Sequence, residues 1–214
     1  MLSSCKSLGF DRGHACLHRK NGEEKMRADE IDWKLLFTLL HPDFFSRDDI
    51  KNLPGEYFFD EMALNLRQFN PKKYRRQLDD SVTFGYYNRS IDDLRSAVAK
   101  VDEDWPQFFN EGDRIYCGFL GGKIASFCTI ADFGTHDVGG ISLRIGGPGC
   151  VGTLAEHRDK GIALTMVRNI TQILAQEGFD LSYVHYTYVP AWYAKLGYKT
   201  VLRWNKSGFS DPDD

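Results

Sequence analysis

The chain has 214 residues, 42% of them hydrophobic and 27% charged, with a formal net charge of -3 and a pI near 6.1. Such a length suits one domain, or one domain with an extension, and the composition is that of an ordinary globular protein. The acidic balance argues against nucleic acid as a partner. No apolar run approaches the length of a membrane span, and the N-terminus lacks the apolar core of a secretory signal, so a cytoplasmic location is expected.

Two clusters of reactive or charged residues are weak evidence for a functional site. Four residues near the N-terminus could in principle bind zinc: Cys5, His14, Cys16 and His18. Their spacing is not that of a zinc site and no CxxC supports them, so no metal is expected. The basic run at residues 72–76 lies beside Asp79 and Asp80 and is interpreted as a solvated loop.

The first 79 residues are expected to lie outside the main domain. Residues 1–25 are interpreted as a disordered leader and residues 26–79 as an N-terminal helical extension. Helical spacing of apolar residues and one capping-box pattern predict its three helices. These are marked by Ile31, Leu35, Leu36, Leu39 and Leu40, then by Ser46 and Asp49, and then by Phe59, Met62, Leu66 and Phe69. The extension is too small to bury a core of its own, so it is expected to pack on the main domain.

Residues 80–206 are predicted to form the main domain, followed by an acidic tail at 207–214. Alternating apolar residues predict strands, and apolar residues at helical spacing predict helices. The expected elements are a strand at 82–86, a helix after Ser90, strands at 114–120, 123–131 and 141–155, a helix at 161–177, a strand at 181–187, a short helix at 189–196 and a strand at 198–204. Gly121 and Gly122 suit a hairpin turn, and residues 133–140 are expected to be a loop.

This order of elements predicts an α/β (α+β) fold, in which helices flank a mixed β-sheet and the helical extension precedes it. A dinucleotide-binding Rossmann domain fits less well, because its glycine loop follows the first strand. Here the glycine-containing loop comes late in the chain, after a hairpin.

The most informative stretch is residues 158–163, Arg-Asp-Lys-Gly-Ile-Ala, which lies between a strand-like run and the long helix. Gly161 and Ala163 would let the backbone approach a bulky anion. The first amides of a helix are unpaired donors, and the helix dipole adds partial positive charge there. Arg158 can add a charge-assisted contact. The stretch is a candidate phosphate site, or else an ordinary helix start that contains a glycine.

A strand, this loop, a long helix, a second strand and the sequence Trp-Tyr-Ala-Lys-Leu-Gly-Tyr at 192–198 follow one another without a break. This succession resembles the second half of the GNAT (GCN5-related) N-acetyltransferase superfamily. The resemblance is strong over residues 150–204, fair over residues 82–133 and absent before them. It implies a GNAT-like fold and acetyl-CoA as the acyl donor.

The resemblance also implies where the donor binds. In the family, the strand before the loop carries a bulge and splays from the next parallel strand, and the pantetheine arm lies in the gap. A backbone N–H of that strand would polarise the thioester carbonyl. The residues that match the strand and the loop are Val151, Gly152, Thr153, Leu154, Arg158, Asp159, Lys160, Gly161, Ile162 and Ala163.

Two residues are candidates for proton transfer. The family often uses a tyrosine after the second splayed strand to protonate the leaving thiolate, and Tyr193 matches that position. A base must deprotonate the acceptor amine, because free amines are mostly protonated at pH 7. His185 on the aromatic strand is the first candidate for this base, and His136 and His157 are the alternatives. Tyr193 could instead be a core aromatic, and each histidine could be structural.

The resemblance implies an N-acetyltransferase that moves an acetyl group directly from CoA to an amine on a small molecule or a peptide. Its partners are then a CoA thioester and an amine acceptor, and family members are often homodimers. The alternative is a non-catalytic module on the same fold that binds CoA or acyl-CoA for regulation. A longer acyl group, or a protein Nε-amine as acceptor, is also compatible with the sequence.

Overall fold

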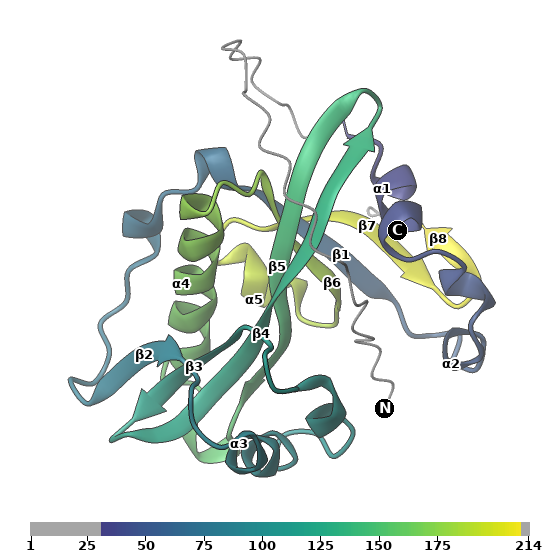
Figure 1. Cartoon of the computed structure of the whole chain (residues 1–214). Helices are drawn as coiled ribbons and strands as arrows, with labels where there is room; N and C mark the ends of the chain where they lie inside the picture. The colour runs from purple at the N-terminus through teal and green to yellow at the C-terminus, as the bar shows by residue number, and fades with distance from the viewer. Residues whose placement is uncertain (1–30, 211–214) are drawn as a thin grey trace.

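The structure is a computed structural model that describes residues 31–210 (Figure 1). The leader expected at residues 1–25 lies outside the described residues, as do the last four residues of the expected tail. The strands are β1 (Phe59–Asn65), β2 (Val82–Tyr86), β3 (Ile115–Leu120), β4 (Lys123–Val138), β5 (Ile141–Thr153), β6 (Leu181–Thr187), β7 (Lys199–Asn205) and β8 (Gly208–Ser210). The α-helices are α1 (Trp33–Leu40), α2 (Asp48–Lys51), α3 (Ile91–Val98), α4 (Ile162–Gln176) and α5 (Pro190–Ala194).

All eight described strands form one mixed sheet, in the order β2-β3-β4-β5-β6-β1-β7-β8. Helices cover both faces, which confirms the predicted fold class. On β4, Cys128 packs with residues of α4, while its neighbour Phe127 packs with residues of α3. On β6, Val184 packs with α4, while its neighbour Tyr183 packs with α1. Since adjacent residues of a strand point to opposite faces, α4 lies on one face, and α1 and α3 lie on the other.

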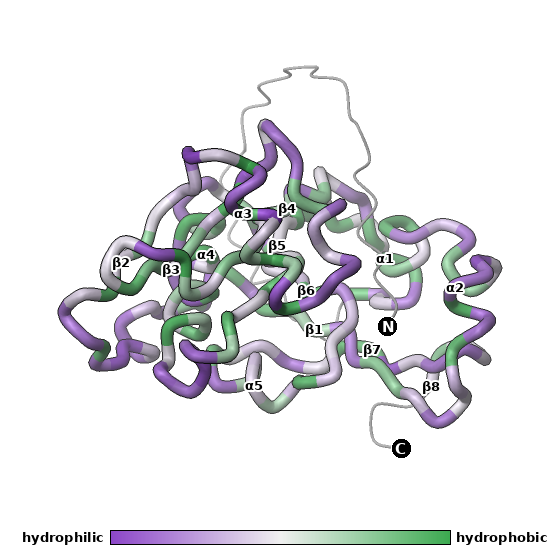
Figure 2. Tube along the Cα trace, turned by 90° about the horizontal axis from the view of Figure 1, so that it is seen from below, coloured by the Kyte–Doolittle hydropathy of each residue, from purple (hydrophilic) through white to green (hydrophobic). Residues whose placement is uncertain are grey.

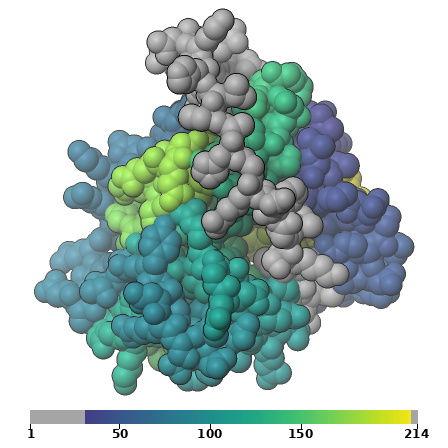
Figure 3. All heavy atoms as spheres, viewed as in Figure 1, coloured from purple at the N-terminus to yellow at the C-terminus, as the bar shows by residue number. Residues whose placement is uncertain are grey.

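β4 and β5 form a long hairpin whose tip projects beyond the helices (Figure 1). In the space-filling view its tip stands between α4 and α1 (Figure 3). The loop predicted at 133–140 is therefore wrong, because β4 continues to Val138 and only Gly139 and Gly140 make the turn. The glycines of β5 stay in the strand because β4 pairs with them, Ala131 with Gly147 and Asp132 with Gly146.

The third helix predicted in the N-terminal extension is also wrong, since Phe59–Asn65 is strand β1. This strand lies between β6 and β7 and pairs antiparallel with both (Figures 1 and 2). Its first five residues are all buried, because helices and aromatic side chains cover both faces of the sheet there. A strand buried on both faces does not alternate between apolar and polar residues. The spacing of the apolar residues in this segment therefore did not distinguish a strand from a helix.

The expected tail begins with another strand of the sheet. Residues Gly208–Ser210 form β8, which pairs with β7 through Asn205 and Trp204. The first strand of the described chain, β1, and its last two strands, β7 and β8, therefore lie next to one another at one end of the strand order.

Candidate active site

A gap opens in the middle of the sheet, between β5 and β6. These two parallel strands pair only at Ile145 with Leu181 and at Gly146 with Ser182. β5 then continues to Thr153 and β6 to Thr187, without further pairing between them in the described chain. The strands thus diverge toward their C-terminal ends, as the resemblance implied.

The closed end of this gap is held tightly. Asp180 is almost fully buried, and its carboxylate accepts hydrogen bonds from the Arg144 backbone N–H and the Arg67 guanidinium, both at 2.9 Å. Just past the last paired residues, the backbones of β5 and β6 nearly touch. A Cβ on Gly147 would lie 1.8 Å from the carbonyl oxygen of Tyr183. Only glycine therefore fits where the strands begin to separate.

A bulge distorts β5 beside the open part of the gap. Gly149 pairs with Thr129 and Gly152 with Phe127, so two residues of β5 face one residue of β4. One of the two, Cys150, has a positive φ of 46°. This is the geometry of a β-bulge, which often re-aims backbone groups near functional sites.

The bulged strand directs some of its amides into the gap. The Leu154 N–H donates to the Ala125 carbonyl at 3.0 Å, so it points away from the gap. Amide direction alternates along a strand, so the Gly152 N–H also points toward β4, and those of Val151 and Thr153 point into the gap. Gly152 has a packing role as well, since a Cβ there would lie 2.3 Å from the Phe127 ring.

The N-terminus of α4 follows the bulged strand closely. Gly161 is the N-cap, with φ of 75° and no side-chain cap, and Asp159 also has a positive φ. The first main-chain bond of the helix runs from the Thr165 N–H to the Gly161 carbonyl. The amides of Ile162, Ala163 and Leu164 therefore remain outside the helical bonding pattern, as an anion site requires.

The side chains of the loop lie on the surface. Arg158, Asp159 and Lys160 are exposed, and the Lys160 ammonium donates to the Glu156 carbonyl at 2.9 Å. Ile162 is buried, so only its backbone is available to a ligand. Of the loop cations, Arg158 is exposed and makes no side-chain hydrogen bond or ion pair within residues 31–210, so it is available to an anion at the helix start.

The fold adds one cation that sequence reasoning missed. A Cβ on Gly161 would lie 3.6 Å from Cδ of Arg76 and 3.4 Å from Leu78. Arg76 belongs to the basic run 72–76, which was interpreted as a solvated loop. No sequence pattern links this run to α4, because Arg76 and Gly161 lie 85 positions apart in the chain and only the tertiary structure brings them together.

Tyr193 lies on the α4 face of the sheet. It is 6% exposed and packs with Val184, Leu196, Tyr198 and residues of α4. Burial strongly raises the pKa of its phenol, and Tyr198 and the thiols of Cys128 and Cys150 raise it further. The phenol is therefore protonated at neutral pH and lies near the bulge residue Cys150.

His185 lies on the opposite face, three residues beyond the closed end of the gap. Its Nδ1 is 3.2 Å from a carboxylate oxygen of Glu61, and its ring stacks on His41 with centroids 3.7 Å apart. The other candidate histidines lie elsewhere. His136 pairs with Leu143 in the hairpin arm, on the far side of the closed end, and His157 follows β5 in a short surface turn.

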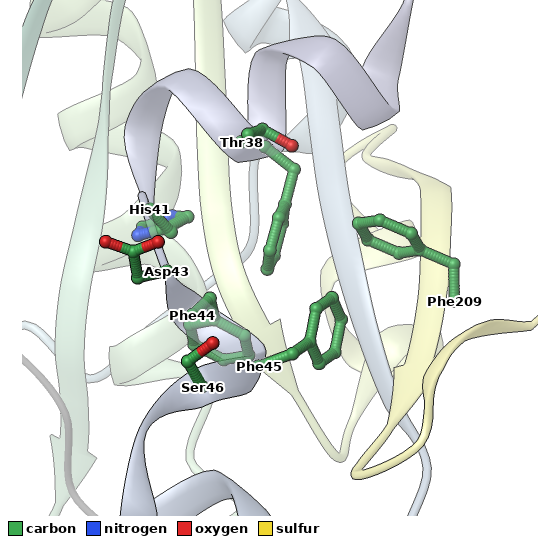
Figure 4. A pocket seen from close by; sticks show the side chains of 8 residues that line it. Thr38, His41, Asp43, Phe44, Phe45, Ser46 and Phe209 are labelled. Carbon is green, nitrogen blue, oxygen red and sulfur yellow. The ribbon is translucent and has the colours of Figure 1, made fainter.

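A cavity of about 220 Å³ lies beyond His41, on the α1 face (Figure 4). Its walls are mostly aromatic rings of α1, of the turn after it and of β8. They are formed by Phe37, Thr38, His41, Asp43, Phe44, Phe45, Ser46 and Phe209. His41 thus lies between this cavity and His185.

Comparison with protein families agrees with this geometry. Residues 83–201, more than half of the chain, match the acetyltransferase (GNAT) domain. The protein therefore belongs to the GNAT family of acetyltransferases. The match begins after β1, so His41 and Glu61 lie outside the matched residues.

Solved structures with the same fold include two acetyltransferases. One is the GCN5-related glucosamine N-acetyltransferase region of a fungal multi-domain GH3 β-N-acetylglucosaminidase, with TM-score 0.60 and 20% identity over 70% of this chain and 20% of that one. The other is a GCN5-related N-acetyltransferase from Sphaerobacter thermophilus, with TM-score 0.52 and 18% identity over 69% of this chain and 50% of that one. The chain thus spans half or less of the length of these proteins, and such identities show the fold alone.

Comparison with curated protein sequences gives no match. Within residues 31–210, no helix has the length and apolar character needed to cross a bilayer. The same residues contain no group of three or more His, Cys, Asp or Glu side chains arranged to hold a metal ion.

Proposed function

We propose that the protein transfers an acetyl group directly from acetyl-CoA to an amine acceptor. The observation that carries this proposal is the gap between β5 and β6, which opens beside a bulge and next to the uncapped start of α4. In one place these features offer amides for a thioester carbonyl and amides for a diphosphate. Family membership supports acyl transfer as the class of reaction.

The donor would occupy the gap with its diphosphate at the start of α4. The free amides of Ile162, Ala163 and Leu164 would bind phosphate oxygens, and the helix dipole would add to their effect. Arg158 and Arg76 would contribute charge-assisted contacts from either side of Gly161. The amides of Thr153 and Val151 would then bind the pantetheine arm and the thioester carbonyl, respectively.

The reaction needs one bond formed, one bond broken and two protons moved. The neutral amine nitrogen attacks the thioester carbonyl carbon, and the Val151 N–H stabilises the negative charge that develops on the oxygen. The C–N bond forms, the C–S bond breaks, and the sulfur leaves with the bonding electron pair. Tyr193 gives its proton to this thiolate, and the nitrogen loses a proton to Nε2 of His185.

The two proton-transfer residues lie on opposite faces of the sheet, with the gap between them. Such a placement would keep the CoA sulfur on the α4 face and the acceptor on the α1 face. Burial raises the pKa of Tyr193, so the phenol is protonated at neutral pH, as an acid must be, but the same shift makes it a weaker proton donor than a free tyrosine.

The first experiment is a thermal shift of the purified protein with acetyl-CoA, CoA, NADH and ATP in parallel. A ligand that binds only the folded state stabilises it and so raises Tm. At a free ligand concentration of a hundred times Kd, the gain in free energy of unfolding is about 2.7 kcal/mol. We expect acetyl-CoA and CoA to raise Tm and NADH to leave it unchanged. Absence of a shift with both CoA species would refute the donor site.

Turnover is then measured as release of the CoA thiol with a panel of amines. The panel includes an amino sugar, a polyamine and a lysine-containing peptide, each tested with acetyl-, propionyl- and succinyl-CoA. Transfer to one of these amines with acetyl-CoA as the best donor is expected. Tight CoA binding without transfer to any of them would instead identify a CoA-binding regulatory module.

A further inference from the structure

Glu61 is a carboxylate in the interior of the sheet, at the centre of β1, with 0% exposure. A buried charge is costly unless its oxygens are hydrogen-bonded. Oε1 accepts the indole N–H of Trp204 at 2.7 Å, and Oε2 accepts the backbone N–H of Tyr186 at 3.2 Å. The third partner is Nδ1 of His185, also 3.2 Å from Oε2.

These contacts fix the tautomer of His185. Trp204 and the Tyr186 backbone can only donate, so the site is built for the anionic form of Glu61. The third partner must then donate as well, which places the proton of the neutral imidazole on Nδ1. Nε2 is left with a lone pair, and it has no hydrogen-bond partner within residues 31–210.

The imidazole ring is also held in orientation. It stacks on His41 at 3.7 Å with an interplanar angle of 20°, and the Phe44 ring meets it edge-on at 5.5 Å. Burial is the main cause that lowers the pKa of His41 to about 2, and the charges of Arg47 and of His185 in its protonated form act in the same direction, so His41 is a neutral neighbour. The phenol of Tyr183 is buried close to Glu61, whose charge helps to raise its pKa.

The position of His185 matches the level of the bulge. A strand rises about 3.3 Å per residue, so His185 lies about 10 Å beyond the paired Ser182, and Cys150 about 13 Å beyond the paired Gly146. The two residues therefore border the same part of the gap, one on each strand. His185 is 13% exposed in its side chain, whereas Glu61 behind it is inaccessible.

We propose that Glu61 is a positioning residue that holds His185 with Nε2 free to take a proton from the acceptor amine. This inference rests on the proposed acyl transfer and assigns it a carboxylate from outside the family-matched residues. During the reaction, the amine proton moves to Nε2, and the carboxylate stabilises the imidazolium that results. The proton then leaves to solvent, which restores the neutral ring.

The tautomer provides a test that needs no substrate. Long-range ¹⁵N–¹H NMR of the imidazoles, assigned with a His185→Gln variant, distinguishes a proton on Nδ1 from one on Nε2. We expect Nδ1–H in the neutral ring of the wild type, and loss of this preference in Glu61→Gln. A neutral His185 protonated on Nε2 would overturn the proposal, whatever the outcome of the CoA-binding experiment.

Kinetics of the full-length protein separate positioning from packing. With an amine accepted in the turnover assay, Glu61→Gln should lower kcat about 10- to 100-fold, with the KM for acetyl-CoA unchanged. His185→Ala should lower kcat about 100-fold or more, and the double variant should be no slower than His185→Ala, because the two residues act as a unit.

The matched control is Trp204→Phe, which removes a different hydrogen bond to the same carboxylate and does not touch His185. Because the carboxylate and its contact with His185 remain, we expect its kcat to fall clearly less than that of Glu61→Gln, even if its Tm falls as much. Equal losses of kcat in Trp204→Phe and Glu61→Gln, or effects of Glu61→Gln and His185→Ala that multiply, would show that Glu61 only supports the fold.

Discussion

At the scale of the residue, Tyr193 and Tyr198, both in the sequence at 192–198, have different surroundings. The Tyr198 hydroxyl lies 2.7 Å from the Ser182 hydroxyl and 2.9 Å from that of Thr171, so it joins β6 and α4 to the start of β7. Burial raises the pKa of Tyr198 to about 12. Tyr193 instead lies near Cys150 at the bulge, where a leaving thiolate would need a proton.

The first prediction separates these two residues. Tyr193→Phe should lower kcat about 100-fold, while Tm and the affinity for CoA stay near wild type, because only the acid is lost. Tyr198→Phe should do the reverse, since it leaves two buried hydroxyls with one partner fewer and costs about 1–3 kcal/mol of stability. Steady-state kinetics and denaturant unfolding measure the two effects. A Tyr193→Phe variant with normal turnover would remove Tyr193 from the mechanism.

The second prediction concerns His41 and the stability of the fold in acid. The pKa of His41 falls from 6.5 in the unfolded chain to about 2 in the folded protein. Between these values the unfolded state binds a proton that the folded state does not, so stability falls as pH falls, by up to about 1.4 kcal/mol per pH unit. In His41→Phe this slope should be smaller, as measured by urea unfolding between pH 8 and pH 4.

The value at pH 8 controls for packing, since His41 is neutral in both states there. A variant that is destabilised equally at pH 8 and pH 4 would show only a change in packing. If the slope of His41→Phe matches that of wild type, the pKa of His41 is not lowered in the folded protein.

At the scale of the element, α4 begins and ends at glycines in the left-handed region. Gly161 precedes its first turn with φ of 75°, and Gly178 follows its last turn with φ of 79°. Both ends were predictable, because glycine at either terminus of a helix is a local signal. Only the first of these glycines lies beside the candidate donor site.

The third prediction uses these two ends as a matched pair. A glutamate at either position would have to adopt a left-handed backbone conformation, which costs about 1–2 kcal/mol of stability in both variants. Gly161→Glu should also weaken CoA binding at least about tenfold, because a carboxylate would occupy the place of phosphate. Gly178→Glu should lose similar stability and keep CoA affinity, as measured by isothermal titration calorimetry. Equal affinities in both variants would contradict the phosphate assignment.

The fourth prediction concerns the closed end of the gap. Gly147→Ala would place a methyl group 1.8 Å from the Tyr183 carbonyl oxygen, so the strands must move apart. We expect a loss of about 3 kcal/mol or failure to fold, at the upper end of overpacking costs. Gly85→Ala is the control, since a Cβ there meets nothing within 4 Å. Similar unfolding midpoints for the two variants would refute the close approach.

At the scale of the whole molecule, the N-terminal segment is part of the sheet. β1 pairs with β6 on one side and with β7 on the other, so its removal would leave two unpaired strand edges inside the domain. It also supplies Glu61, while the turn after α1 supplies His41. The segment expected to pack on the main domain is thus continuous with it.

The fifth prediction follows from this arrangement. A fragment of residues 80–210 contains all the family-matched residues but lacks β1. We expect it to be insoluble or unfolded by circular dichroism, because buried backbone groups of β6 and β7 would lose their partners. A folded fragment that still binds CoA would show that the N-terminal segment is dispensable.

Local patterns predicted the elements whose signals are contained in their own residues. The Gly121-Gly122 hairpin turn, helix α4 between its two glycines and the capped helix α3 were all predictable, because turn residues and helical periodicity act over a few positions. The same patterns failed for β1 and for the arm of the β4–β5 hairpin. In both, pairing with neighbouring strands outweighs local preference, as for the glycines of β5 that β4 holds in the sheet.

The sequence by itself determined the class of fold, the glycine loop at the start of α4 and the motif that carries Tyr193, since each depends on neighbours within a few residues. The tertiary structure alone decided that Arg76 reaches Gly161 and that Glu61 contacts His185 across 124 positions of the chain. The physical reason is that such contacts join residues from distant segments, and their energies arise only once the sheet has assembled.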